Sequence, residues 1–297
     1  MSGGPVLLRA GALEAALSPA GGGSLLWLRH GGLDVLRRAP VDCRDPLGMA
    51  SFPLVPFANR IAHGRFAFAG RDYQLPRNFG DHPHSIHGTG WQAVWDVVEQ
   101  SADAVRLVQD HRGGADWPWA YRAEQYVEVR PDAIDMRLML TNRSDAAMPA
   151  GLGFHPYFLA DAGTQLQFAA TSLWLATPDM LPDREVAADA LGDWSRGAGV
   201  MGDTLIDNVY AGWDGCATIV RGDSTRIVLT ASGAGWLHVY RPPGSVDFCI
   251  EPVSHCPDAI NRAGGMAVLA PGASTQLSMT IAIDKSDQTL PKSDGIA

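Results

Sequence analysis

Alternation of apolar and polar side chains is the dominant pattern along this 297-residue chain. Residues 121–130 alternate, a short break follows at 131–133, and apolar side chains then return at every second position from Ile134 to Leu140. Successive side chains of a β-strand point to opposite faces of the sheet. The pattern therefore predicts an antiparallel hairpin with one buried face.

Four further segments have the composition of strands: residues 227–230, 236–240, 246–251 and 277–283. The sequence Arg-Pro-Pro-Gly at 241–244 lies between the second and third of these segments and predicts a turn. Helical periodicity is scarce, and only residues 183–190 suggest a short helix.

These elements together indicate an all-β protein. Many strands separated by Gly- and Pro-rich turns, without alternation of strands and helices, favour a large antiparallel β-sandwich or barrel with few short helices. No internal repeat or linker divides the chain, so we expect a single domain over residues 1–284. Residues 285–297 are polar and are expected to form a disordered tail.

Charge and composition exclude several classes of partner. The chain has 23 basic and 32 acidic side chains, a formal charge of −9, so it has no basic footprint for nucleic acid or an anionic membrane. No apolar run approaches the roughly 20 residues that cross a bilayer, and the N-terminal residues lack the pattern of a secretory signal. The four cysteines form no C-x-x-C pair, so the expected location is a reducing cytoplasm.

Lysine is almost absent from the chain. The only two lysines are Lys285 and Lys292, so 21 of the 23 basic residues are arginines. A Schiff-base lysine in the folded body and a phosphate-loop lysine are therefore excluded. Pyridoxal enzymes, Schiff-base aldolases and P-loop NTPases are excluded with them.

Two local motifs carry little weight. Residues 197–202 match G-x-G-x-x-G, but no strand precedes them, so a loop is expected rather than a dinucleotide site. His82, His84 and His87 have the spacing of a metal site, yet the residues that follow offer no glutamate of the cupin type. Ligands distant in the sequence stay open, but we expect neither a metal nor another cofactor.

Polar side chains in rigid turns and at strand ends are the candidates for chemistry. Arg60 follows a proline-spaced apolar run, and His87 precedes a glycine. His155 lies among aromatic residues, where Pro156 keeps it out of helical geometry. Each also has an ordinary structural explanation, as an ion-pair partner, a turn histidine or a hydrogen-bonded core histidine.

Glu251 belongs to the predicted strand at 246–251. Alternation places it on the face opposite Val246, Phe248 and Ile250. Pro252 lacks an amide proton and is expected to end the regular pairing, so Glu251 is predicted at a strand end. Taken alone, this carboxylate is more typical of a solvated strand residue than of an active site.

Taken together, five segments resemble the aldose 1-epimerase (galactose mutarotase) family in order, spacing and local sequence. The likeness covers about residues 5–284 and rests on Asn59-Arg60-Ile61, His87-Gly88, His155-Pro156-Tyr157-Phe158, Asp207 before Asn208-Val209-Tyr210, and Glu251-Pro252 followed by Pro257-Asp258-Ala259-Ile260-Asn261. The resemblance implies a galactose mutarotase-like supersandwich. It also implies an isomerase of carbohydrate metabolism that interconverts the α and β anomers of a free aldose without a cofactor.

The resemblance also implies roles for individual residues. Glu251 would be the catalytic base at the C1 hydroxyl, and His155 the acid at the ring oxygen, protonated when the pyranose arrives. Arg60, His87 and Asp207 would bind the substrate. The expected partner is a monosaccharide, and the protein is expected to be a monomer or homodimer. Trp91, Trp213 and Trp236 are candidates for an aromatic wall against the sugar.

Two departures from the family pattern put the identity of the sugar in doubt. Val253-Ser254 follows Glu251-Pro252 where many relatives carry glutamine. The segment after His87 also contains fewer glycines than the commonest form in the family.

Three other functions stay open. One is a glycosidase or lyase that uses Glu251 and Asp207 as paired carboxylates. Another is a sugar-binding module without catalysis. The third is a phosphorylated-hexose 1-epimerase, which would need extra arginines at one end of the cleft, with Arg65, Arg71 and Arg77 as candidates.

Overall fold

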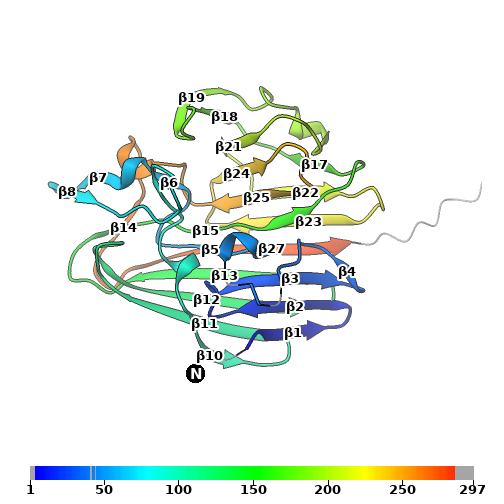
Figure 1. The fold of residues 1–297 in the computed structure, drawn as a ribbon, viewed down its shortest axis with the longest axis horizontal. Helices are drawn as coiled ribbons and strands as arrows, with labels where there is room; N and C mark the ends of the chain where they lie inside the picture. The colour runs from blue at the N-terminus through cyan, green and yellow to red at the C-terminus, as the bar shows by residue number, and fades with distance from the viewer. Residues whose placement is uncertain (1–3, 41, 44, 285–297) are drawn as a thin grey trace, which may run out of the picture.

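The computed structural model of this protein describes residues 4–40, 42–43 and 45–284. Strands dominate these residues, and Figure 1 shows them gathered in twisted sheets that lie one over another. The polar segment 285–297 lies outside the described residues. The tail and the single-domain boundary therefore stay predictions.

The largest sheet has nine strands, all antiparallel. In spatial order they are β10 (Asp96–Gln100), β11 (Ala104–Arg112), β12 (Ala120–Arg130), β13 (Ala133–Asn142), β27 (Ser274–Asp284), β23 (Arg226–Ser232), β22 (Cys216–Val220), β17 (Gln165–Phe168) and β20 (Ala198–Gly199). The pairing of Arg130 with Ala133 confirms the hairpin predicted from alternation. The inward side chains of β12 and β13 are buried in the main hydrophobic cluster.

A second sheet has eight strands. In order they are β19 (Pro182–Ala187), β18 (Ser172–Ala176), β21 (Ile206–Ala211), β24 (Trp236–Arg241), β25 (Asp247–Val253), β15 (Gly153–Phe154) and β5 (Pro53–Leu54), with β16 (Tyr157–Leu159) paired to β25. The predicted turn at 241–244 is confirmed, because it joins β24 to β25.

A third sheet lies at the N-terminal end and contains four strands, coloured dark blue in Figure 1. They are β1 (Val6–Ala10), β2 (Leu13–Ser18), β3 (Ser24–His30) and β4 (Leu33–Asp34). β1 and β2 pack on β11 and β12. Apolar side chains from all three sheets meet in one buried cluster, and this confirms the predicted antiparallel β-sandwich.

Short elements complete the described chain. Three two-stranded ribbons pair β6 (Arg60–Ile61) with β9 (Ser85–Ile86), β7 (Arg65–Phe68) with β8 (Arg71–Gln74), and β14 (Met148–Ala150) with β26 (Ala267–Leu269). The helices are single 3₁₀ turns: η1 (Pro46–Gly48), η2 (Ala62–Gly64), η3 (Gly90–Gln92), η4 (Trp194–Arg196) and η5 (Ala259–Asn261). In the described part of the chain, no helix is long and apolar enough to cross a bilayer.

Two local predictions are wrong. The helix suggested at residues 183–190 is instead the end of strand β19, up to Ala187, followed by a turn. Val186 pairs with Leu173 of β18, so pairing at the edge of the sheet overrides local helix propensity. Pro252 does not end the pairing of β25, because it lies opposite Leu237. It falls between the segments of β25 that pair with β16 and β15. A residue without an amide proton at this position therefore costs the sheet no hydrogen bond.

The strand β25 departs from alternation for a second reason. Its residues from Phe248 to Val253 are all buried, whereas Val246, predicted to share the apolar face, precedes the strand and is exposed. Glu251 is therefore buried rather than solvated. Both faces of this strand are covered.

Candidate active site

A cavity of about 330 Å³ brings together residues from distant parts of the chain. It is lined by Arg37, Leu47, Asn59, Arg60, Phe79, Ile86, His87, His155, Tyr157, Asp207, His238, Tyr240, Pro242, Asp247 and Glu251. All five side chains predicted as site residues are therefore in one place. Their roles stay predictions.

Three neighbouring strands of the eight-stranded sheet supply the floor of the cavity. Asp207 of β21 pairs with Tyr240 of β24, and His238 of β24 pairs with Glu251 of β25. Residues paired across antiparallel strands point to the same face, and so do residues two apart on one strand. All four side chains therefore share one face of the sheet, and this face meets the cavity.

The opposite wall is built from backbone turns that hold Arg60 and His87. Asn59 and His87 both have left-handed backbone conformations, with φ of 55° and 60°. The Asn59 amide donates to His87 Nδ1 at 3.1 Å, and the His87 amide donates to the Asn59 carbonyl at 2.8 Å. Because Nδ1 accepts a hydrogen bond here, the neutral His87 ring carries its proton on Nε2. This leaves an N–H donor for a ligand.

Gly88 fixes the path of this turn. Its φ is 71°, and a Cβ atom at this position would lie 2.3 Å from the carbonyl oxygen of Val55. The amides of Thr89 and Gly90 both donate to that same carbonyl at 3.0 Å. Only glycine fits here, and the turn positions His87 through the backbone.

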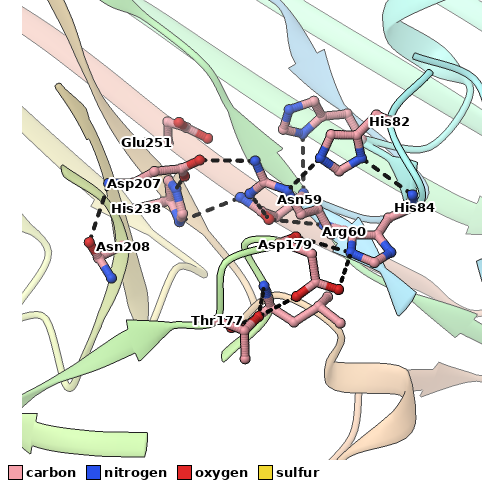
Figure 2. Close-up of polar contacts among 12 residues, drawn as sticks. Asn59, Arg60, His82, His84, Thr177, Asp179, Asp207, Asn208, His238 and Glu251 are labelled. Atoms are coloured by element: carbon pink, nitrogen blue, oxygen red, sulfur yellow. Dashed lines mark hydrogen bonds and ion pairs between the residues drawn. The ribbon is translucent and has the colours of Figure 1, made fainter. Parts of the chain in front are cut away.

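Four side chains at one end of the cavity form a closed ring of hydrogen bonds, which Figure 2 shows around Arg60. Arg60 donates to Asp207 Oδ2 at 2.9 Å and to Asn59 Oδ1 at 3.0 Å. The ring closes through His238, whose Nε2 lies 2.6 Å from Asp207 Oδ1 and whose Nδ1 lies 3.4 Å from Asn59 Nδ2. We call this the recognition ring.

Charge is balanced within the recognition ring. Burial alone would raise the pKa of Asp207, but hydrogen bonds and charges from His238 and Arg60 outweigh it and hold this pKa below its usual range. The carboxylate is therefore ionised at neutral pH and paired with the Arg60 guanidinium.

The other end of the cavity holds a histidine and a carboxyl group in close contact. His155 Nε2 lies 3.3 Å from Glu251 Oε1, and the exposed fractions of the two residues are 5% and 1%. The imidazole is stacked between Phe52 and Tyr157, with ring centroids at 4.5 and 4.8 Å. His155 Nδ1 and Glu251 Oε2 are buried without a hydrogen-bond partner among the described residues. We call these two residues the catalytic pair.

Burial sets the protonation of the catalytic pair. It raises the pKa of Glu251 well above its ordinary value, and the negative charge of Asp207 adds to this effect. It lowers the pKa of His155 to about 3, with a further contribution from His238. The free protein therefore favours a protonated Glu251 beside a neutral His155. This differs from the predicted ionised base and protonated acid, because a buried site disfavours both charges.

His87 is also neutral. Burial lowers its pKa well below the ordinary value, and the neighbouring His155 adds to the effect. The ring edge of His87 faces His155 at a centroid distance of 5.3 Å. An uncharged N–H donor therefore adjoins the catalytic pair.

Several lining residues were missed from the sequence. His238 could have been found, because it lies in the strand joined to that of Glu251 by the predicted turn, two positions before Tyr240. Arg37 follows β4 in irregular chain and has no comparable signal. Its guanidinium lies 3.3 Å from the centre of the Tyr157 ring and 3.6 Å from Asp247 Oδ2, and its Nε donates to the carbonyl of Met49.

The aromatic lining differs from the prediction. Phe79, Tyr157 and Tyr240 line the cavity, whereas the three tryptophans predicted as its aromatic wall do not. Trp91 lies behind His87 at a centroid distance of 5.7 Å, and Trp213 is buried in the core. Indole rings here fill interior volume, so their abundance was a poor guide to the cavity.

The histidines at 82, 84 and 87 turn toward three different partners. His87 contacts Asn59, His82 accepts from Arg60 Nε at 3.4 Å, and His84 Nδ1 accepts the amide of His63 at 3.0 Å. His84 Nε2 lies 3.0 Å from the carbonyl of Asp179 (Figure 2). The spacing of the three histidines therefore does not bring their ligand atoms to one point.

Comparison with known proteins gives the family. A family model described as aldose 1-epimerase matches residues 6–282. The uncharacterised protein YphB of Escherichia coli K12 is 33% identical over 246 residues, which cover 78% of this chain and 83% of that protein. Galactose mutarotase of Mus musculus is 34% identical over 110 residues, 36% of this chain and 31% of the mouse protein.

Solved structures agree with the sequence relatives. A candidate aldose 1-epimerase of Escherichia coli K12 has a TM-score of 0.87 at 30% identity, covering 94% of this chain and 98% of that one. A galactose mutarotase-like protein from Clostridium acetobutylicum has a TM-score of 0.83 at 20% identity, over 94% and 95% of the two chains. The second likeness is one of fold alone.

Proposed function

This chain belongs to the aldose 1-epimerase family, and from that premise we propose that it is an isomerase which interconverts the α and β anomers of a free aldose. The observation that carries the proposal is the catalytic pair. One carboxyl group and one imidazole lie 3.3 Å apart, both face the cavity, and each has a polar atom without a partner among the described residues. Anomer exchange needs one acid and one base and no cofactor.

The reaction balances within the pair. The C1 hydroxyl loses its proton to the base, the ring oxygen gains a proton from the acid, and the C1–O5 bond breaks to give the open aldehyde. Rotation about C1–C2 presents the other face, and the same two transfers in reverse close the ring. In our proposal Glu251 is the base and His155 is the acid.

The pair contains the single dissociable proton that this sequence of steps requires. In the free site that proton resides on Glu251, and its transfer to His155 yields the carboxylate and imidazolium that begin ring opening. Hydroxyl groups of a bound sugar replace the solvent that burial removed, and they stabilise the charged form. Arg60 favours the Glu251 carboxylate by its positive charge.

The recognition ring would bind hydroxyls away from the reacting carbon. Each Asp207 oxygen accepts one hydrogen bond within the ring and has a second lone pair for a sugar hydroxyl. The Nε2–H of His87 is directed by the bond at its Nδ1 and would donate to the ring oxygen or a hydroxyl. Phe79, Tyr157 and Tyr240 supply apolar contact for the sugar ring.

The alternative functions have weaker support. A glycosidase would need Asp207 as a reactive carboxylate, but both its oxygens are held by Arg60 and His238. A phosphorylated sugar would need an unpaired cation, and Arg65, Arg71 and Arg77 do not line the cavity. The two arginines that do line it face Asp207 and Asp247.

Polarimetry on freshly dissolved α-anomers of a panel of hexoses and pentoses tests the proposal. We expect the parent protein to accelerate mutarotation, and Glu251→Gln and His155→Ala each to lose about 10²–10⁴-fold of that rate. Glu14→Gln makes the same chemical change on the four-stranded sheet and should leave the rate unaltered. A parent that leaves the spontaneous rate unchanged for every sugar would refute the activity. Full activity in Glu251→Gln would remove that residue from the base role.

A further inference from the structure

A buried thiol lies beside the catalytic pair and takes no part in the proposed reaction. Cys249 is two residues before Glu251 on β25, so both side chains point to the same face, and it pairs with Tyr157 of β16 and Tyr240 of β24. One ligand atom each from His155, Cys249 and Glu251 lie within 4.8 Å of one another, and all three residues are buried.

We propose that His155, Cys249 and Glu251 form an inhibitory site for a thiophilic divalent metal ion of the zinc class. An imidazole, a thiolate and a carboxylate are the ligand types that Zn²⁺ takes in proteins, and three of them leave a fourth position for water. A bound metal ion would inhibit the reaction, because it would occupy the nitrogen and oxygen atoms with which the catalytic pair transfers protons. The inhibition arm of this proposal rests on the proposed function, whereas the binding arm does not.

The geometry is close to that of a tetrahedral site. Bond lengths of about 2.0–2.3 Å to nitrogen, oxygen and sulfur place neighbouring ligand atoms roughly 3.3–3.6 Å apart. His155 Nε2 and Glu251 Oε1 already lie at 3.3 Å. The thiol lies within 4.8 Å of a ligand atom of each residue, so a shift of roughly 1–1.5 Å would complete the site.

The hydrogen bonds of the pair leave the necessary lone pairs free. His155 Nδ1 has no partner and can carry the ring proton, so Nε2 can donate its lone pair to a metal. Glu251 Oε2 has no partner among the described residues either. Tyr157 pairs with Cys249 across β16 and β25, which places its side chain beside the thiol.

Charge balance makes binding compatible with burial. Loading releases one proton from the Cys249 thiol and one from the catalytic pair, while a dication enters, so the net charge of the buried site does not change. Because these ligands bind a metal only when deprotonated, protons compete with the metal. Affinity should rise with pH, by up to about a hundredfold per unit where both protons are released.

A second cluster of possible metal ligands provides an internal control for this proposal. His63, His84 and Asp179 also place ligand atoms within 4.8 Å of one another. Here His84 Nδ1 accepts the amide of His63, so the single ring proton is on Nε2, where it faces Asp179. A metal at Nε2 would require a doubly deprotonated imidazole. We expect no strong binding there, although the ligand types look equally suitable.

Cobalt spectroscopy tests the binding arm without reference to catalysis. Tag-free, chelator-stripped protein would carry Cys43→Ser and Cys216→Ser, which remove the two less buried thiols. We expect a thiolate-to-Co²⁺ charge-transfer band that Cys249→Ser and Cys249→Ala abolish and His63→Ala retains. Absence of the band, or its persistence in both Cys249 variants that keep the parent's circular dichroism, would overturn the site.

Inhibition by Zn²⁺ tests the consequence. Cys249→Ala should mutarotate within about twofold of the parent, and its half-inhibitory Zn²⁺ concentration should rise by at least about tenfold. Equal inhibition of parent and Cys249→Ala would overturn the role of the thiol. A cobalt band in a protein that does not mutarotate any sugar would support the metal site while refuting the proposed function.

Discussion

At one end of the cavity four side chains close a ring of hydrogen bonds, whereas at the other end two side chains keep polar atoms without partners. Asn59, Arg60, Asp207 and His238 satisfy one another, and their charges balance. The unpartnered atoms are His155 Nδ1 and Glu251 Oε2. A group that only holds a ligand can be fixed in advance by its neighbours, but a group that exchanges protons must keep lone pairs available.

The difference is also electrostatic. Both carboxyl groups are buried on the same sheet face, yet the pKa of Asp207 is held below its usual range by His238 and Arg60 and that of Glu251 is raised by burial. Both side chains are carboxylic acids on the same sheet face. Hydrogen bonds from His238 and Arg60 to Asp207 decide which carboxyl group stays ionised.

Replacing one carboxyl group at each end by an amide should separate the two ends most strongly. Asp207→Asn leaves the Arg60 guanidinium buried without its counter-ion, and we expect a loss of about 3–5 kcal/mol in the free energy of unfolding. Glu251→Gln replaces a group that is already neutral in the folded protein and removes the cost of protonating it there, so it should cause no loss of stability at neutral pH. Urea unfolding at neutral pH measures both. Equal losses in the two variants would contradict the contrast.

The pH dependence of stability sharpens the contrast within the catalytic pair. Between about pH 4.3 and 6.5 the unfolded chain carries ionised Glu251 and protonated His155, whereas the folded pair holds its one proton on Glu251. Both states therefore bind the same number of protons, and the pair contributes no slope in the parent.

Single variants should separate the pH dependence of stability due to His155 from that due to Glu251. In Glu251→Gln the lowered pKa of His155 remains, the unfolded state binds more protons, and stability should rise by up to about 1.4 kcal/mol per pH unit in this window relative to the parent. In His155→Asn the raised pKa of Glu251 remains, and stability should fall with pH by a similar amount. Slopes of the same sign would show that the pair is not neutral in the folded protein.

The smallest expected effect concerns His238, which closes the recognition ring. His238→Gln keeps one hydrogen bond to Asp207 or Asn59 but not both, and should cost about 1 kcal/mol of stability. Because His238 orients Asp207 rather than exchanging protons, KM should rise several-fold with kcat nearly unchanged. Steady-state polarimetry separates the two parameters. A fall in kcat at constant KM would place His238 with the reacting groups.

The sequence predicted which residues form the site better than it predicted their protonation. Arg60, His87, His155, Asp207 and Glu251 do line one cavity, because motifs far apart in the chain had a recognisable order. Their protonation was not predictable, since it depends on burial by residues from other strands.

Local patterns failed where tertiary contacts decide. Alternation predicted β12 and β13 because only one face of that hairpin is buried. The expectation that a proline ends strand pairing was wrong at Pro252, whose place between two short partner strands is a property of the assembled sheet. Residues 183–190 were misjudged for the same reason, because β18 captures them as an edge strand.

The turn at Gly88 limits how this protein could be engineered. The wall that presents His87 is determined by main-chain geometry, and no side chain can be introduced at Gly88 without displacing the Val55 carbonyl. Libraries that aim to change the accepted sugar should leave this wall intact and vary Phe79, Tyr240 and Pro242, whose side chains line the cavity. Evolvability is therefore unevenly distributed around one small cavity.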